Sequence, residues 1–252
     1  MVSIHHISLS RVQLETIPDP ERRLLVLVAH AANELNVLSK LFHFSARSVS
    51  ETVILKQAEN AQALVLARVL TGKIYECWKL LGSAFFGTAL SQTYEPMFDE
   101  EASRALDQVK RYFGRENPIA VVRNGHAFHY SLDQIDAGYR AVIDDDPFDI
   151  YLSEASANAL YVFADTVAGR AMLEAIMPGD AKGAFELLIS DTTRMVDKIN
   201  TVIGAIMMIC FKKYVGEDLY SLGAKLIEIE GAPNSQGIVI PYFIELVEGN
   251  DT

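Results

Sequence analysis

TVILKQAENAQALVLARVLTGKIYECWKLLGSAFFGTAL, residues 52–90, is apolar on nearly every side when it is wound as an α-helix. The positions that make this pattern are Val53, Ile54, Leu64, Val65, Leu66, Val69, Leu70, Trp78, Leu80, Leu81, Phe85 and Phe86. A helix without a polar face is expected at the centre of a bundle, because no side of it can be left in water. Gly72, Gly82 and Gly87 are points at which this helix can kink or end, because glycine is a poor helix former.

Helices are also predicted on both sides of this central segment. Asp19 and Pro20 are typical of a helix start, as an N-cap followed by a proline in the first turn, and apolar residues then dominate as far as Phe42. Ser48 and Glu51 have the spacing of a capping box in front of the central helix. Further helices are predicted over residues 98–113, 118–130, 131–143, 166–176 and 181–214.

The helical pattern is interrupted after the helix predicted over residues 131–143. Asp144 to Asp146 are typical of a solvated turn. FDIYL (148–152) and NALYVFA (158–164) have the composition of two short strands in a hairpin. The tail IVIPYFIEL (238–246) is predicted to be strand-like or extended, and its proline places it at an edge.

The composition is that of a globular protein, since half of the 252 residues are hydrophobic and 22% are charged. The expected fold is mainly α, a bundle of long helices with a small β or irregular insert near 148–163. No composition break marks a domain boundary, so we expect a single all-α domain over residues 1–252 with N- and C-terminal elaborations.

Charge and cysteine content narrow the expected partners and compartment. The net charge of −11 gives no general attraction to phosphate backbones, so any contact with nucleic acid requires a local positive site. Cys77 and Cys210 each lie in an apolar stretch and are expected to be buried thiols in a reducing compartment. The run INTVIGAIMMICF (199–211) is shorter than the about 20 residues that span a bilayer, so it is predicted to be a core helix. We expect a soluble, cytoplasmic protein without membrane contact.

The candidate site is VVRNGHAFHY, residues 121–130. On an α-helix with about 100° per residue, one arc of about 120° collects the polar residues Arg123, His126, His129 and Tyr130 together with Ile119 and Val122. The other side, with Ala120, Val121, Ala127 and Phe128, is predicted to pack on the core, and Asn124 lies between the two.

This set of side chains suits the cleavage of RNA without a metal. The 2′-hydroxyl of RNA can attack the adjacent phosphate if a base, an acid and positive charge are at hand. Histidine titrates near neutrality and serves as base or acid, while arginine binds phosphate through a planar fork. Arg123 and His129 lie about 9 Å apart along the helix axis, and a second copy of the helix across a twofold axis would close that gap.

Two other interpretations of the same residues stay open. The arginine and histidines can form a structural pair that ties helices together. His126 and His129 can instead ligate a metal together with a carboxylate such as Asp144 or Asp145, although no further ligand pattern accompanies them.

The segment RNGHAFH resembles the Arg-polar-x(3–5)-His motif of the HEPN superfamily (higher eukaryotes and prokaryotes nucleotide-binding domain), and VRNGHAFHY is similar to a variant common in bacterial HEPN-like proteins. The resemblance implies an all-α bundle that dimerises, so that two motif helices form one site. By position, Arg123 and His129 would be the catalytic pair, and Asn124 would orient them. His126 and Tyr130 are neighbours that the motif does not require.

The resemblance also implies a function. Many HEPN domains are metal-independent ribonucleases of toxin–antitoxin, phage-defence and CRISPR systems. The leading hypothesis is thus an endoribonuclease of toxin or defence type, which leaves a 2′,3′-cyclic phosphate and needs no cofactor or metal. Its expected partners are RNA or a nucleotide, a second copy of the chain, and an antitoxin protein. The alternative is a non-catalytic HEPN-like module that binds a nucleotide or a protein.

Overall fold

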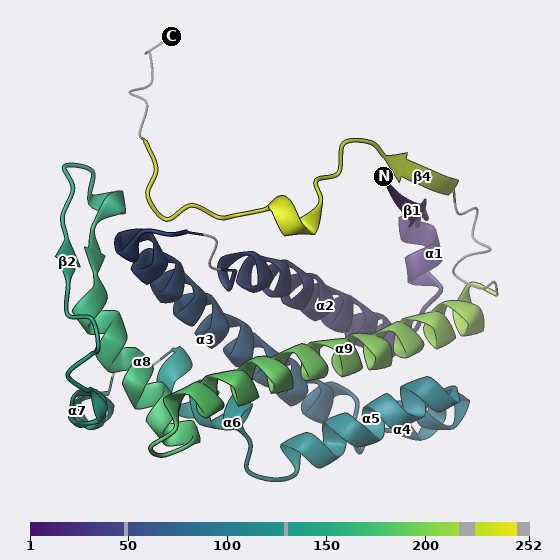
Figure 1. The fold of residues 1–252 in the computed structure, drawn as a ribbon. Helices are drawn as coiled ribbons and strands as arrows, with labels where there is room; N and C mark the ends of the chain where they lie inside the picture. Colours follow the sequence, from purple (N-terminus) through teal and green to yellow (C-terminus); the bar gives the residue numbers. More distant parts are fainter. Residues whose placement is uncertain (48–49, 129–130, 217–224, 246–252) are drawn as a thin grey trace. The chain divides into compact units, whose positions relative to one another are not determined.

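The computed structural model describes residues 1–47, 50–128, 131–216 and 225–245, and it is mainly α-helical (Figure 1). The predicted fold class, a bundle of long helices with few short strands, is confirmed. The three longest helices in the described ranges are α2 (Asp19–Ser45), α3 (Val53–Ala84) and α9 (Ala181–Tyr214).

The chain divides into two compact units, each assembled from three stretches of sequence. Unit 1 comprises Met1–Val37, Lys73–Asn117 and Thr192–Gly237, and unit 2 comprises Leu38–Gly72, Pro118–Asp191 and Ile238–Thr252. The boundaries between the stretches fall within α2, α3 and α9 and just before residue 118. The expectation of a single domain stays a prediction.

Unit 1 consists of helices and a two-stranded ribbon. Its core is formed in part by residues 199–211 of α9, where Ile199, Val202 and Ile206 are all at most 1% exposed, so the core-helix prediction for this run is confirmed. Besides its parts of the three long helices, it holds β1 (Val2–His6), α1 (Arg11–Glu15), α4 (Ala89–Tyr94), η1 (Glu95–Met97), α5 (Glu100–Phe113), β4 (Lys225–Ile229) and η5 (Ser235–Gly237).

The central helix ends earlier than predicted, at Ala84 instead of residue 90. Gly87 has a φ of 70°, a left-handed conformation that suits glycine and that breaks the α-helical path. The chain restarts as α4, where the Thr88 side chain accepts a hydrogen bond from the backbone of Leu90 at 3.1 Å. Gly72, another of the three glycines at which a kink or an end was predicted, lies inside α3.

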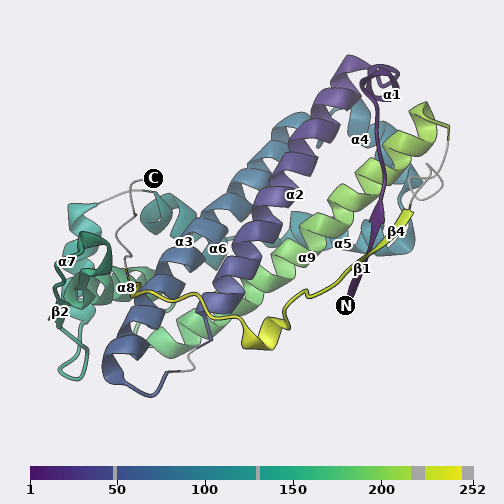
Figure 2. The same cartoon turned by 90° about the horizontal axis from the view of Figure 1, so that it is seen from above.

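The ribbon of β1 and β4 is a feature that sequence analysis missed. Val2 pairs with Ile229 and His6 with Lys225 in an antiparallel register, and Figures 1 and 2 show the two strands side by side. Every residue of both strands is exposed, so no buried apolar face marks them as part of the core.

Unit 2 holds the candidate site and the predicted insert. The predicted hairpin is present, because Ile150 pairs with Tyr161 and Tyr151 with Leu160 in an antiparallel register. Its strands are shorter than predicted, since residues 162–164 already belong to the helix that follows. In addition to its parts of the long helices, the unit contains α6 (Pro118–Val122), the π-helical turn η2 (Arg123–Ala127), α7 (Leu132–Ala141), β2 (Ile150–Tyr151), η3 (Ser156–Asn158), β3 (Leu160–Tyr161) and α8 (Val162–Ile176).

The C-terminal tail joins unit 2 through hydrogen bonds from irregular chain. No strand is assigned over residues 238–245, the described part of the predicted extended segment. Tyr242 donates from its hydroxyl to the carbonyl of Ala159 at 2.8 Å, and Asn158 exchanges two hydrogen bonds with the backbone of Ile244. The tail therefore packs against the hairpin as an irregular segment and adds no strand to it.

The environment of the two cysteines agrees with the prediction. Cys77 and Cys210 are free and buried, at 3% and 1% exposure. Burial raises the pKa of the Cys77 thiol to about 12, with a smaller contribution from Glu34, and burial also raises the pKa of Cys210. Both thiols are therefore protonated and unreactive at neutral pH.

Helix α2 has one property that the sequence analysis overlooked. Among the described helices it is long and apolar enough, by length and composition alone, to cross a membrane, although Glu34 and Lys40 interrupt its apolar residues. A core helix of a soluble protein has the same character. The cytoplasmic location and the absence of membrane contact stay predictions.

Candidate functional site

The motif residues lie at the end of a short helix whose inner side is anchored in the core of unit 2. Helix α6 starts at Pro118 as predicted, and Ile119 and Val122 are fully buried. Val122 forms one cluster with Met172 of α8 and Leu188 of α9. α-Helical geometry stops at Val122, and residues 123–127 continue as a π-helical turn, which we call the motif turn. Such turns are rare and are frequent at functional sites.

The structure corrects the predicted arrangement of this segment, which was one α-helix over residues 118–130. Ile119 and Val122, expected on the same arc as Arg123, face the core, whereas Phe128, expected to pack on the core side, is 50% exposed. The predicted arc assumed α-helical geometry over the whole of residues 118–130. The i→i+5 bonding of the motif turn winds the chain more slowly, so the residues after Val122 leave the predicted arc.

Arg123 and Asn124 are coupled by a hydrogen bond, in keeping with the orienting role expected for the asparagine. Arg123 donates from Nη1 to Oδ1 of Asn124 at 3.2 Å, and Asn124 is exposed while Arg123 is partly buried. The other two predicted residues, His129 and Tyr130, lie outside the described residues. The geometry of the Arg123–His129 pair therefore stays a prediction.

His126 is half-buried and has a second guanidinium nearby. Burial lowers the pKa of His126, and the positive charge of Arg68 on α3 lowers it further. Arg68 in turn lies 3.8 Å from Oδ1 of Asp165, whose pKa is raised by burial against the opposing effect of Arg68. His126 is thus neutral at pH 7, able to accept a proton or a hydrogen bond. Arg68 was missed by the sequence analysis, although a lone cation in an apolar run is a signal that could have found it.

Two glycines, Gly72 and Gly125, occupy positions near the motif turn where a Cβ atom would meet a neighbouring side chain. A Cβ atom on Gly72 would lie 2.4 Å from the ring of Phe128, and one on Gly125 would lie 2.5 Å from Nε2 of Gln134. At Gly72 the ring of Phe128 occupies the space that a Cβ atom would need, whereas the neighbour of Gly125 is the far end of the flexible Gln134 side chain.

The lowered pKa of His126 predicts how stability depends on pH. Because the folded-state pKa lies below the unfolded value of about 6.5, the unfolded chain binds the proton first as the pH falls. Stability from this residue is complete above that value and is lost on acidification through the folded-state pKa. We expect the midpoint of urea denaturation to fall less between pH 7.5 and pH 5.0 in His126→Gln than in the wild-type chain. Parallel profiles for the two proteins would contradict the assignment.

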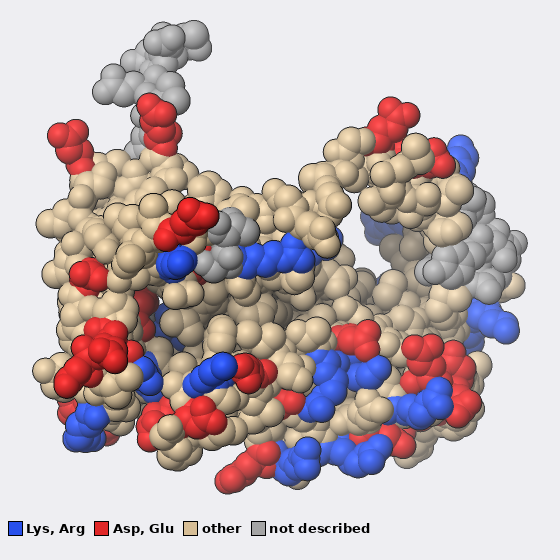
Figure 3. Space-filling view, viewed as in Figure 1, with Lys and Arg blue, Asp and Glu red and all other residues tan. Residues whose placement is uncertain are grey.

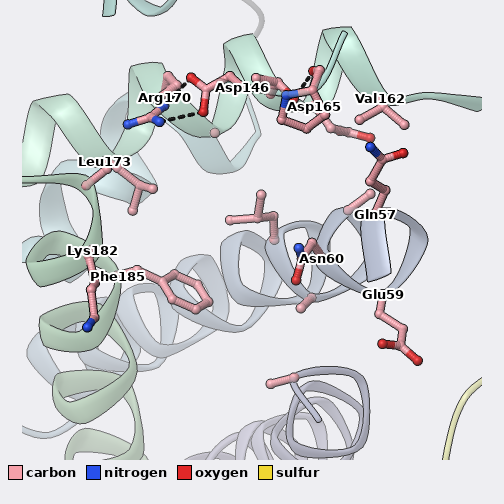
Figure 4. Close-up of a pocket in the computed structure, with 18 of the residues that line it drawn as sticks. Gln57, Glu59, Asn60, Asp146, Val162, Asp165, Arg170, Leu173, Lys182 and Phe185 are labelled. Atoms are coloured by element: carbon pink, nitrogen blue, oxygen red, sulfur yellow. Dashed lines mark hydrogen bonds and ion pairs between the residues drawn. The ribbon is translucent and has the colours of Figure 1, made fainter. Parts of the chain in front are cut away.

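A second feature of unit 2 is a cavity of about 380 Å³ (Figure 4). Its walls come from the end of α2, from α3, α8 and the start of α9, and from the loop at residues 146–147.

Arg170 donates to both carboxylate oxygens of Asp146 at 2.7 and 2.5 Å. These hydrogen bonds lower the pKa of Asp146. The prediction of a solvated turn over Asp144 to Asp146 is therefore wrong for Asp146, whose side chain is only 13% exposed.

The metal interpretation gains no support from the described part of the chain. Within residues 1–47, 50–128, 131–216 and 225–245 no three His, Cys, Asp or Glu side chains are grouped so that they could hold a metal ion. The set proposed for a metal includes His129, which lies outside these residues, so the hypothesis itself is untested.

Comparison of the chain with models of protein families, with curated proteins and with solved structures gives no significant match. The HEPN-like assignment therefore rests on the motif residues themselves and is carried forward as a proposal.

Proposed function

We propose that this chain is a HEPN-like, metal-independent endoribonuclease, with the motif turn as its phosphate-binding element. The observation that carries the proposal is the position of Arg123. Its guanidinium lies at a π-helical turn, hydrogen-bonded to an exposed asparagine, at the end of a helix whose other side is fully buried. A planar, permanently charged fork on an anchored support is well suited to bind a phosphodiester.

The proposed reaction is an internal transfer of the phosphoryl group. A base removes the proton of the 2′-hydroxyl, and the resulting oxygen attacks the adjacent phosphorus. The bond to the 5′-oxygen breaks, and an acid returns a proton to that leaving oxygen, so the products are a 2′,3′-cyclic phosphate and a 5′-hydroxyl. His129 is the proposed acid or base, and Arg123 stabilises the negative charge on the phosphoryl oxygens in the transition state.

Two copies of the chain are proposed to form one active site. One copy of the chain provides one arginine and one histidine in the motif positions, and a second copy across a twofold axis would supply the other pair. A toxin of this kind is also expected to have an antitoxin protein that blocks the site. Light scattering on the purified chain tests the dimer directly.

Arg123→Ala is expected to lower RNA cleavage at least about 100-fold, because it removes a donor to charge that develops in the transition state. His129→Ala should do the same, and Arg123→Lys should retain only part of the activity because lysine lacks the fork. The substrate is a pool of single-stranded RNA oligonucleotides in the presence of EDTA, and the readout is the cyclic-phosphate end.

Two controls make this test specific. Arg140→Ala removes an exposed arginine of α7 and should leave cleavage unchanged. The same oligonucleotides with 2′-deoxyribose should not be cut, since they lack the nucleophile. Cleavage that persists in Arg123→Ala, or that stops in EDTA, would contradict the mechanism.

A second candidate, the non-catalytic binding module, is favoured by the charge distribution. On the face drawn in Figure 3, basic and acidic residues are interspersed along α5, where Glu100 and Glu101 begin the helix and Lys110 and Arg111 end it. Such a mixed surface suits a protein partner better than a long nucleic acid. On this hypothesis, Arg123→Ala lowers the affinity for a bound nucleotide or protein and no variant changes a turnover.

A further inference from the structure

The cavity of unit 2 contains two buried polar atoms with no hydrogen-bond partner among the described residues. Glu59 of α3 and Ser45 at the end of α2 both line it and are 8% and 4% exposed. Within the described ranges, Oε2 of Glu59 and Oγ of Ser45 have no hydrogen-bond partner. A buried carboxyl oxygen without a donor is costly, because nothing replaces the water that it has lost. This pair of atoms therefore indicates a donor that the described residues do not supply.

The carboxyl group of Glu59 is held in place by its other oxygen. Oγ of Ser50 donates to Oε1 of Glu59 at 2.5 Å. That hydrogen bond limits rotation of the carboxyl group and leaves Oε2 as the open acceptor. An acceptor that is already oriented before binding loses less conformational entropy when a ligand arrives.

The other acidic side chains that line the cavity already have basic partners. Asp146 is bound by the guanidinium of Arg170, and Asp165 lies 3.8 Å from Arg68. Figure 4 shows the Arg170–Asp146 pair on one side of the cavity and Glu59 at the opposite end. A cationic ligand would therefore find its counter-charge at Glu59.

Apolar side chains supply most of the remaining wall. Leu64, Val162, Leu173 and Phe185 line the cavity, and Figure 4 shows the ring of Phe185 projecting from α9 toward α3. The volume of about 380 Å³ lies within the range of sites for small molecules. These surroundings suit a compact apolar body with a single strongly donating group.

We propose that this cavity binds a small organic cation, an amine or guanidine with an apolar body, whose N–H groups donate to Oε2 of Glu59 and Oγ of Ser45. The site is separate from the motif turn and does not depend on the proposed ribonuclease activity. A charged donor is favoured over a neutral one because hydrogen bonds between ionised partners are about twice as strong.

Three probes that share an indole ring and differ in the charge of the side chain test the proposal. Their binding to the full chain is measured by isothermal titration calorimetry. Tryptamine carries an ammonium group, 3-propylindole carries no charge, and indole-3-propionate carries a carboxylate. We expect tryptamine to bind one site with a Kd below about 1 mM. The neutral probe should bind at least about 10-fold more weakly, and the anion should bind most weakly of the three.

Two variants assign the binding to the proposed atoms. Glu59→Gln keeps the size of the side chain and removes its charge, so tryptamine should bind about 10- to 100-fold more weakly. Ser45→Ala, a smaller change, should weaken binding about 2- to 10-fold. The matched control Glu154→Gln, an exposed glutamate of the same unit, should bind as the wild-type chain does.

The proposal is overturned if tryptamine does not bind, or if the anionic probe binds more tightly than the cation. It is also overturned if Glu59→Gln retains its melting temperature and its full affinity for tryptamine. If Glu59→Gln does not fold, Ser45→Ala decides the question alone. Unchanged affinity for tryptamine in that variant would show that Oγ of Ser45 does not contact the ligand, and the proposal would be overturned.

Discussion

Gly138→Ala is expected to lower the melting temperature by about 2–12 °C, from a loss of about 1–3 kcal/mol at roughly 2–4 °C per kcal/mol. Gly138 is buried on α7, where the helix lies directly against α8. A Cβ atom there would lie 2.3 Å from the carbonyl oxygen of Val167 and 2.8 Å from Cβ of Ala171. Both neighbours are backbone or fixed to it, so the two helices must move apart to admit a methyl group.

A second glycine provides the control for this prediction. Gly204 lies within α9 and has no atom within 4 Å of a Cβ position. There the substitution Gly204→Ala brings only the helix-forming advantage of alanine and should stabilise the protein by about 0.5–1 kcal/mol. Opposite signs for the two Gly→Ala variants, measured by thermal unfolding, are the expected result. Equal stabilisation in both would show that α7 does not pack against α8 as closely as described.

Leu188→Ala is expected to destabilise the protein by about 2–5 kcal/mol, because it opens a cavity in a fully packed cluster. Leu188 is 1% exposed and contacts the cluster that includes Val122 and Met172. Val122 is the last α-helical residue before the motif turn. We therefore expect this variant to loosen the support of Arg123 as well as to lower the free energy of unfolding.

The adjacent residue Leu187 is the matched control. It lies on the same helix, carries the same side chain and is 38% exposed. Leu187→Ala should cost less than about 1 kcal/mol, because little area leaves the core. Denaturation by urea measures both variants, and hydrogen exchange of residues 119–127 reports on the support of the motif turn. Similar losses for the two leucines would contradict the cluster.

Helix boundaries were the part of this fold that local signals predicted best. The helix expected over residues 181–214 runs from Ala181 to Tyr214, and α5 (Glu100–Phe113) has Asp99 as its N-cap and Gly114 as its C-cap. The helix expected over residues 131–143 is α7 (Leu132–Ala141), and its N-cap Ser131 makes no capping hydrogen bond through its side chain. Such signals lie within a few residues of the boundary that they specify, so a single stretch of sequence contains them.

The candidate site was predicted only in part, for a reason that lies in distance along the chain. The motif residues are neighbours in sequence, so they could be proposed from the sequence, and the structure adds the hydrogen bond between Arg123 and Asn124. The approach of Arg68 to His126 joins positions nearly sixty residues apart. A lone cation in an apolar run marks Arg68 as unusual, but nothing local shows which residue it approaches. The π-helical turn itself depends on how α6 packs in the core of unit 2, so ideal helix geometry predicted the wrong arc.

The amino-acid sequence by itself determined that this protein is a mainly α-helical bundle with a short hairpin, and that a basic and imidazole-rich motif follows a helix start at Pro118. Only the tertiary structure decided that Asp146 pairs with Arg170, that β1 pairs with β4, and that Glu59 is buried with an open acceptor. Hydrophobic periodicity and capping act within one element and are visible along the chain. Pairing and burial of polar groups arise between distant segments, because they depend on which surfaces close the core.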